Sequence, residues 1–591
     1  MRPGREFSAQ LAAHAAAHGD RDALVYVADP DVPADIEALS YAQVHDGAGR
    51  VAALLQTRLR AGERAMLMYP PGLRFAIGFL GCLYAGVVPV VVPVPDGQRH
   101  RSRRLSVVAH NAGVTALLTE RSAVETARQW AADLHLADLP CIATDASGLP
   151  DAGQCQPPAP DLGRIAFLQY TSGSTSDPRG VAVTAANLAE NAQVYLRVTG
   201  AAADARHGGW LPMHHDNGLI GLFLAPLYGG GTSVQMPAST FLRHPQRWLR
   251  LVDRLDLDVS SAPNFAYELC LRRIQDHQVH GLDLSRWHVA MNGAEPIRAA
   301  TMRAFLDRFR RYGLRPEALS PGYGLAEATL AVCGAGQGLP FHVVAVDPDR
   351  LAHGTFHPVP AGPDGGPPAG TREIVSCGRV EDYDLRIVDP DTGRVREDGQ
   401  VGEVWLRGPS VAHGYWRNPE ASRATFEAVT ADGDAGYLRT GDLGVRHDGE
   451  LYVTGRIKEV LIVNGRNLYP QDLEAEARLA HETAGTVHSA AFTVLEDQIV
   501  LVQEVRAGSA ALSDVAGAIG QRLTGEFGVS VSVVLVRSGT VERTTSGKVQ
   551  RLAVRAAFAE GRLRPLHSAL TPPVRAYLAA AGEPVQAGTG R

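Results

Sequence analysis

A loop rich in hydroxyl groups and glycine carries the first chemistry that this sequence suggests. It lies within LQYTSGSTSDPRG, residues 168–180, which also holds the basic residue Arg179. The apolar stretch 165–168 predicts a buried strand that leads into the loop. A strand that opens into such a loop presents N–H and O–H donors to anionic oxygens, and glycine lets the backbone approach a phosphate closely. The residues that we expect to bind phosphate are Thr171, Ser172, Gly173, Ser174 and Thr175. The loop is not a P-loop, because no Gly-Lys-Ser/Thr follows at the required spacing. For this segment taken alone, a Ser/Thr-rich surface turn is the alternative.

Four further segments follow this loop in one order. They are PGYGLAEAT (321–329), YLRTGDL (437–443), GRIKEVLIVNG (455–465) and RTTSGKVQR (543–551). Any one of them alone would be a weak signal. Together they resemble the adenylate-forming superfamily of acyl- and aminoacyl-activating enzymes over nearly the whole chain, from about Phe7 to about Phe558. The subtype looks like a fatty acyl-AMP ligase, and four segments carry that likeness: 210–221 (WLPMHHDNGLIG), 292–297 (NGAEPI), YGLAEAT and 462–474 (IVNGRNLYPQDLE).

The resemblance implies a set of nucleotide-binding residues. It places the adenine ring against Tyr323, where an aromatic face supplies affinity through stacking. Asp442 would accept both ribose hydroxyl protons, and Glu327 would hold Mg²⁺, which prefers hard carboxylate oxygens. Taken alone, Asp442 would be an ordinary turn aspartate. The further nucleotide contacts that the resemblance implies are Gly293, Ala294, Glu295, Gly324 and, at the ribose or phosphate, Arg456.

The resemblance also implies the groups that act on the acid. Lys548 would contact the acyl carboxylate and the α-phosphate, where a mobile point charge stabilises the transition state. His215 would lie beside the acyl-phosphate centre, Arg456 would assist at the phosphate, and Lys458 would be the hinge of a mobile domain. A metal site at His214-His215-Asp216 is disfavoured, because adjacent side chains of a strand point to opposite faces. This chain departs from the pattern twice: Ala326 stands where many relatives carry Thr, and Asn217 where this branch usually shows Met.

Composition limits the class of protein. The chain has 591 residues, 45% of them hydrophobic and 20% charged, with a net charge of −6. The absence of a basic excess argues against a general nucleic-acid or membrane-surface binder. Six cysteines without a Cys-x-x-Cys pair suggest neither zinc nor a disulfide framework, so we expect a reducing cytoplasm. The uncharged run 75–95 is broken by proline and glycine, which predicts a buried helix, a turn at Gly86 and a buried strand, not a stable membrane insertion.

The pattern of elements predicts an α/β fold with two domains. We expect a large domain of packed sheets and helices over 1–457, with a family insertion and loop at 331–375. A small, mobile α+β domain would cover 458–567, and a flexible tail 568–591. Locally, Ser40 would cap a helix, 447–449 would form a hairpin turn, and the Pro/Gly-rich stretch 358–370 would be a loop.

The sequence therefore predicts a monomeric enzyme that converts a fatty acid and ATP to acyl-adenylate and pyrophosphate. The acyl group would then pass to the phosphopantetheine thiol of a carrier protein or synthase on a separate chain. A coenzyme A ligase and a non-enzymatic nucleotide or acyl sensor are the alternatives. Candidates for the acyl pocket are Met213, Phe265, Tyr267 and Met291. The resemblance implies that the insertion restrains the small domain and so disfavours coenzyme A, with apolar anchors at Phe341, Val343, Val344 and Val346. An inert surface loop is the alternative.

Overall fold

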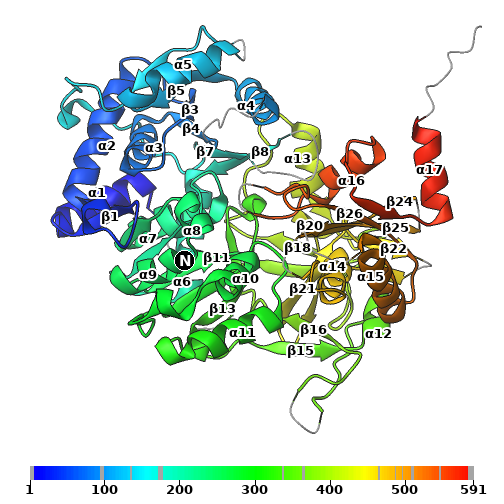
Figure 1. Ribbon diagram of the computed structural model, residues 1–591. Helices are drawn as coiled ribbons and strands as arrows, with labels where there is room; N and C mark the ends of the chain where they lie inside the picture. The colour runs from blue at the N-terminus through cyan, green and yellow to red at the C-terminus, as the bar shows by residue number, and fades with distance from the viewer. Residues whose placement is uncertain are drawn as a thin grey trace, which may run out of the picture.

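The protein is described by a computed structural model (Figure 1). It covers residues 5–93, 99–133, 136–170, 178–335, 338–362, 366–463, 466–485, 488–495, 497–506, 511–544 and 547–582. We call the described residues up to 457 the large domain and those from 458 onward the small domain, after the boundary predicted above. The phosphate-loop residues Thr171, Ser172, Gly173, Ser174 and Thr175 lie outside the described residues.

Two mostly parallel sheets form the body of the large domain. The order of the eight-stranded sheet is β14 (Ala331–Gly334), β13 (Leu319–Gly324), β12 (Val289–Asn292), β11 (Val259–Ala262), β9 (Arg206–Gly209), β10 (Thr232–Gln235), β1 (Asp22–Val27) and β2 (Ile36–Ser40). The order of the six-stranded sheet is β6 (Cys141–Ala143), β5 (Val114–Thr119), β3 (Arg64–Leu67), β4 (Val88–Val91), β7 (Ile165–Tyr170) and β8 (Gly180–Thr184). Only the edge strands β2, β8 and β14 pair antiparallel to their neighbours. The carboxyl ends of the parallel strands therefore meet at shared edges, where ligands bind in such folds.

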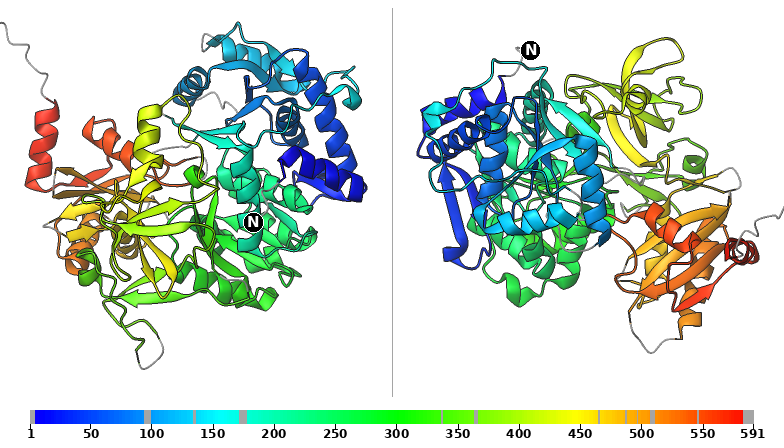
Figure 2. Two further views of the ribbon diagram at one scale, coloured as in Figure 1. Left: turned by 180° about the vertical axis from the view of Figure 1, so that it is seen from behind. Right: turned by 90° about the horizontal axis from the view of Figure 1, so that it is seen from above.

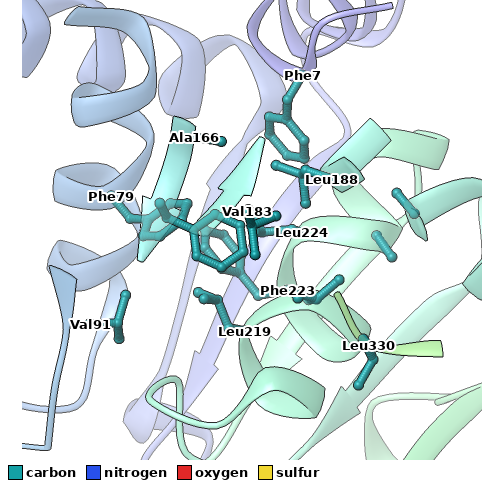
Figure 3. Close-up of a cluster of buried hydrophobic side chains, with 14 of the residues drawn as sticks. Phe7, Phe79, Val91, Ala166, Val183, Leu188, Leu219, Phe223, Leu224 and Leu330 are labelled. Atoms are coloured by element: carbon teal, nitrogen blue, oxygen red, sulfur yellow. The ribbon is translucent and has the colours of Figure 1, made fainter. Parts of the chain in front are cut away.

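Helices cover both faces of these sheets. Between the sheets lie α1 (Phe7–His18), α2 (Tyr41–Gln56), α3 (Leu73–Ala85), α6 (Ala185–Thr199), α7 (Ala225–Gly229) and the π-helix η4 (Asn217–Leu224). On the outer faces lie α4 (Arg99–Ala112), α5 (Val124–Asp133), α8 (Ala238–Arg243), α9 (Gln246–Arg254), α10 (Asn264–Arg273) and α11 (Ala299–Phe309). In the middle layer Phe79, Phe167 and Phe223 pack ring against ring (Figure 3). This apolar core joins the two sheets and fixes the strand ends relative to one another.

A third, antiparallel sheet carries two of the motifs. It contains β17 (Asp384–Val388), β18 (Gly402–Arg407), β19 (Ala428–Val429), β20 (Ala435–His447) and β21 (Glu450–Arg456), with α13 (Pro419–Phe426) beside it. Figure 2 shows this sheet in yellow, next to the blue and green body. The predicted turn joins β20 to β21, with positive φ angles of 50° at Asp448 and 77° at Gly449. Two such residues match the type I′ turn of a hairpin, so this prediction is confirmed.

The small domain has its own sheet and its own core. Its strands are β24 (Ser489–Leu495), β25 (Gln498–Val505), β26 (Val531–Arg537) and β27 (His567–Ala569), preceded by the hairpin β22 (Leu461–Val463) and β23 (Arg466–Leu468). Its helices are α14 (Pro470–Leu479), α15 (Leu512–Phe527), α16 (Arg551–Ala559) and α17 (Pro572–Gly582). The predicted two-domain α/β fold is confirmed. The prediction of a flexible tail is wrong for residues 568–582, because β27 pairs with β26 and Val574 of α17 is fully buried.

The predicted insertion forms a compact hairpin on the large domain. Strand β15 (Val343–Val346) pairs with β16 (Arg372–Val375), and α12 (Pro348–Ala352) follows β15. Phe341 and Val343 pack against the core of the eight-stranded sheet, while Val344 and the fully buried Val346 pack against a cluster that includes Tyr469. The expected apolar anchors are therefore present.

Other local predictions also hold. Ser40 Oγ accepts the Gln43 N–H and Gln43 Oε1 accepts the Ser40 N–H, which is a capping box at the start of α2. Helix α3 ends at Gly86 with φ 72°, and β4 follows directly. The six cysteines all lie in the described ranges, and none of them forms a disulfide. Among the described helices, none combines the length and apolar character needed to cross a membrane.

Candidate active site

The candidate active site is a cleft between the two domains. The end of β13, the turn before η4, the β20–β21 pair and a loop of the small domain all line it. Figure 2 shows the small domain, in orange and red, beside the large domain. The described parts of the predicted motifs therefore meet in one place.

Asp442 is the centre of the expected ribose site. It stands opposite Arg456 in the β20–β21 register, and only 5% of it is exposed. Arg456 Nε donates to one carboxylate oxygen at 2.7 Å, and the Tyr323 hydroxyl donates to the other at 2.8 Å. The charge of Asp442 raises the pKa of Arg456, and burial together with Asp442 raises the pKa of Tyr323. Three predicted nucleotide residues thus form one hydrogen-bonded group, in which Arg456 and Asp442 form an ion pair.

Glu327 lies on the short 3₁₀ turn η8 (Ala326–Ala328), directly after β13. Its carboxylate accepts a hydrogen bond of 2.8 Å from the Tyr415 hydroxyl, and burial raises its pKa. The Arg179 guanidinium stands 5.1 Å from the centre of the Tyr415 ring. The turn is tight, because a Cβ at Gly324 would lie 2.0 Å from the Leu330 carbonyl oxygen, so only glycine fits there.

Tyr415 is a functional candidate that the sequence analysis missed. It is 88 residues from Glu327, and its only local signal is an aromatic pair with Trp416 between Gly414 and Pro419. The role of Arg179 in holding this tyrosine was not predicted either.

Lys548 reaches the cleft on a narrow loop of the small domain. The Thr544 N–H donates to the Lys548 carbonyl at 2.8 Å, and the Lys548 N–H donates to Thr544 Oγ1 at 3.1 Å. Gly547 adopts φ 89°, and a Cβ there would lie 2.6 Å from the Phe265 ring of the large domain. Glycine is required by the dihedral angle and by the close approach. The loop is therefore seated directly on the large domain.

The electrostatics around Lys548 come from both domains. Burial lowers its pKa, Asp216, Glu295 and Asp442 act to raise it, and Arg456 lowers it further. Carboxyl groups from three separate segments of the large domain thus act on the charge of Lys548. Such a cation is positioned to neutralise negative charge that develops in the cleft.

The segment that contains His215 is a turn before η4, not a strand. The strand-based argument against metal binding was therefore wrong in its premise. Within the described part of the chain, no group of three or more His, Cys, Asp or Glu side chains could hold a metal ion. Burial, His214 and Lys548 all hold the pKa of His215 well below its ordinary value. The imidazole is therefore neutral near pH 7.

The NGAEPI segment leaves the end of β12 in a strained turn. Ala294 adopts φ 68°, which non-glycine residues rarely do. Glu295 Oε1 accepts the Phe265 N–H at 2.6 Å, and burial raises the pKa of Glu295 to about 7. Gly293 passes close to Gly322, where a Cβ would lie 2.8 Å from the carbonyl oxygen. Glu295 therefore links the cleft to Phe265, the residue on which the Lys548 loop rests.

Comparisons with known proteins agree with this geometry. The AMP-binding enzyme family matches residues 11–416. The medium-chain-fatty-acid–[acyl-carrier-protein] ligase JamA of Moorena producens is 38% identical over 543 residues, 90% of this chain and 91% of that protein. A long-chain-fatty-acid–AMP ligase of Mycolicibacterium smegmatis is 37% identical, over 90% of each chain. The chain belongs to the fatty acyl-AMP ligases of the AMP-binding enzymes. The crystal structure of a fatty acid AMP ligase from Legionella pneumophila superposes with a TM-score of 0.74 at 33% identity, covering 95% of this chain and 97% of that one.

In this acyl-AMP ligase the predicted hinge, Lys458, lies two residues after the end of β21, at the start of the small domain. The next residue, Glu459, accepts a hydrogen bond of 2.7 Å from Arg551. The same guanidinium donates to Glu474 at 2.6 and 2.8 Å. The described contacts do not test whether the chain turns at Lys458, so the hinge stays a prediction.

Three of the four expected acyl-pocket residues line the cleft of this ligase: Met213, Phe265 and Met291. Tyr267 does not, so its assignment to the pocket is wrong. It is fully buried, packs edge-on against Trp248 and Phe305, and donates its hydroxyl to the Met291 carbonyl at 2.9 Å. Tyr267 therefore supports the strand that carries Met291.

Proposed function

We propose that this acyl-AMP ligase activates a fatty acid with ATP and passes the acyl group to the phosphopantetheine thiol of a separate carrier protein. AMP-binding enzymes use ATP, and the relatives named above are fatty-acid ligases. The proposal depends on one observation: Lys548 of the small domain lines the same cleft as the nucleotide residues of the large domain. The close approach of Gly547 to the Phe265 ring supports this placement.

The first step would be attack of a carboxylate oxygen on the α-phosphorus of ATP. A bond forms between that oxygen and phosphorus, the bond to the bridging oxygen breaks, and pyrophosphate leaves with the electron pair. Lys548 would draw the acyl carboxylate and the α-phosphate together and neutralise charge in the transition state. Tyr323 and Asp442 would hold the adenine and ribose, and neutral His215 would donate a hydrogen bond near the reacting oxygens.

Magnesium fits the donor set at Glu327. Glu327 offers a single buried carboxylate, and no cluster of three or more metal-binding side chains occurs among the described residues. Such a site suits an ion that is held by one protein group and by substrate phosphates. When bound, Mg²⁺ would neutralise phosphate charge. Tyr415 would orient the Glu327 carboxylate through its 2.8 Å hydrogen bond.

The second step would be attack of the carrier thiol on the acyl carbonyl, with AMP as the leaving group. Contacts between the insertion and the small domain support a carrier over free coenzyme A. Arg372 of β16 lies 3.0 Å from Asp472, and Asp349 lies 3.1 Å from Arg466. These ion pairs would hold the small domain in the arrangement that places Lys548 in the cleft.

The test is to incubate the enzyme, ATP, Mg²⁺ and a mixed-length fatty-acid pool, and to identify products by mass spectrometry. We expect acyl-adenylate alone, thioester after addition of a phosphopantetheinylated carrier, and little thioester with coenzyme A. Lys548→Ala should lose the adenylate, while Arg555→Ala, which removes an exposed charge on the same domain, should keep it. Absence of adenylate from the wild-type enzyme would refute the proposal. Rapid acyl-coenzyme A formation would favour a coenzyme A ligase.

A further inference from the structure

A buried amide oxygen that has no hydrogen-bond partner among the described residues belongs to a residue of the cleft. Asn217 begins the π-helix η4, two residues after His215, and lines the cleft. Its Oδ1 atom is buried, and no group among the residues that the structure describes donates a hydrogen bond to it. Leaving a buried polar atom unpaired is unfavourable, so such a group in a binding cleft points to a polar feature of the ligand.

The surroundings of this amide are apolar. A Cβ at Gly221, one helical turn on, would lie 2.6 Å from Asn217 Oδ1, 2.9 Å from the Tyr195 ring and 3.2 Å from a Leu330 methyl group. Tyr195 and Leu330 are buried, and the Tyr195 hydroxyl lies 3.3 Å from Ser261. The amide is therefore a polar spot on an otherwise apolar wall that also lines the cleft.

The place of the amide limits where a partner group can be on the substrate. Asp216, the preceding residue, is close enough to Lys548 to oppose the effect of burial on its charge. Asn217 lines the same cleft as Lys548, which is the proposed contact of the acyl carboxylate, so we place its amide beside the first carbons of a bound acid. A hydroxyl group there satisfies either orientation of an amide, because it can donate to the oxygen or accept from the nitrogen.

We propose that Asn217 hydrogen-bonds a hydroxyl group on carbon 2 or 3 of the acyl chain, which makes hydroxylated fatty acids the preferred substrate class. This inference rests on the proposed function, because it assumes that the cleft binds a fatty acid. A site built to hydrogen-bond a substrate hydroxyl rejects the analogue without it more strongly than an apolar pocket rejects one methylene group.

The test compares kcat/KM for decanoate, 2-hydroxydecanoate, 3-hydroxydecanoate and 10-hydroxydecanoate, measured by pyrophosphate release. We expect the wild-type enzyme to prefer the 2- or 3-hydroxy acid over decanoate by about tenfold or more. Asn217→Met should bring this ratio to one or below. Asn217→Ala, which removes the amide without adding bulk, should do the same and so excludes a purely steric effect.

Several results would overturn the inference. A wild-type ratio within twofold would do so, and so would a ratio that both variants leave unchanged. A preference for the 10-hydroxy acid alone would move the polar contact to the far end of the pocket, away from Asn217. These outcomes leave the proposed function standing, whereas failure to form an adenylate from any of the four acids would refute that function instead.

Discussion

Arg372 offers the sharpest test of how the small domain is restrained. It lies on β16 of the insertion and contacts two residues of the small domain. Its Nε atom is 3.0 Å from Asp472, and its guanidinium stands 4.2 Å from the centre of the Tyr469 ring. The side chain of Arg372 is 18% exposed, so both contacts are largely shielded from water. We therefore expect Arg372→Ala to weaken the closed arrangement of the two domains.

The expected effect follows from the two contacts. A partly exposed ion pair contributes about 0.2–1 kcal/mol, and a cation–π contact with a largely buried ring contributes about 1–2 kcal/mol. Their loss would cost about 1–3 kcal/mol of restraint, which corresponds to about a 5- to 150-fold rise in the population of released small domain. If release limits the use of coenzyme A, thioester formation should rise by a factor in this range.

The assay is the initial rate of acyl-coenzyme A formation from ATP, a fatty acid and coenzyme A, with acyl-adenylate formation measured in parallel. The matched control is Arg303→Ala. Arg303 pairs with Glu373, the neighbour of Arg372 on the same strand, at 2.7 Å, but both partners belong to the large domain. The reasoning is refuted if Arg372→Ala leaves the coenzyme A rate unchanged, or raises it no more than Arg303→Ala does.

Four further predictions follow. Lys548→Ala should lower acyl-adenylate formation about a hundredfold or more, because a preorganised cation is lost; pyrophosphate release at the wild-type rate would remove Lys548 from the mechanism. Asp442→Ala should weaken ATP binding about tenfold or more in calorimetry, and an unchanged affinity would contradict the ribose assignment. Lys458→Pro should spare at most one of adenylation and acyl transfer, so normal rates of both would place the hinge elsewhere. Burial lowers the pKa of His207 to about 3, so the unfolded chain takes up a proton between pH 6.5 and 3 that the folded protein does not. This contribution to stability is complete above pH 6.5 and falls by about 5 kcal/mol as the pH approaches 3. His207→Leu should therefore flatten the loss of urea resistance on acidification, and an identical slope would contradict the assignment.

The features that the sequence predicts well depend on neighbouring residues. Ser40 caps a helix through a partner three positions away, Gly86 ends α3 because its φ is positive, and Asp448-Gly449 forms a two-residue turn. The resemblance likewise assigned Asp442 and Arg456 to one nucleotide site, and the hairpin register places them opposite each other.

The features that could not be predicted from the sequence depend on contacts between distant segments. Tyr415 holds Glu327 across 88 positions, and no periodic pattern records such a pair. Helix α17 forms because Val574 finds a buried place on the small domain, although the Ala-, Gly- and Pro-rich composition around it suggested fraying. Tyr267 was expected in the acyl pocket, but its side chain is fully buried in the core.

Arg551 connects the loop of Lys548, the proposed catalytic lysine, to the chain beside the predicted hinge. It follows Lys548 by three positions and holds both Glu459 and Glu474. With Lys458 as the hinge, these ion pairs would make the segment after the hinge and the loop of Lys548 move together as one rigid body. Rotation would then withdraw the cation from the cleft as the thiol path opens. Pyrophosphate could then no longer attack the adenylate with the help of that charge. The motion that admits the acceptor thiol would therefore also slow the reverse reaction, in which ATP forms again.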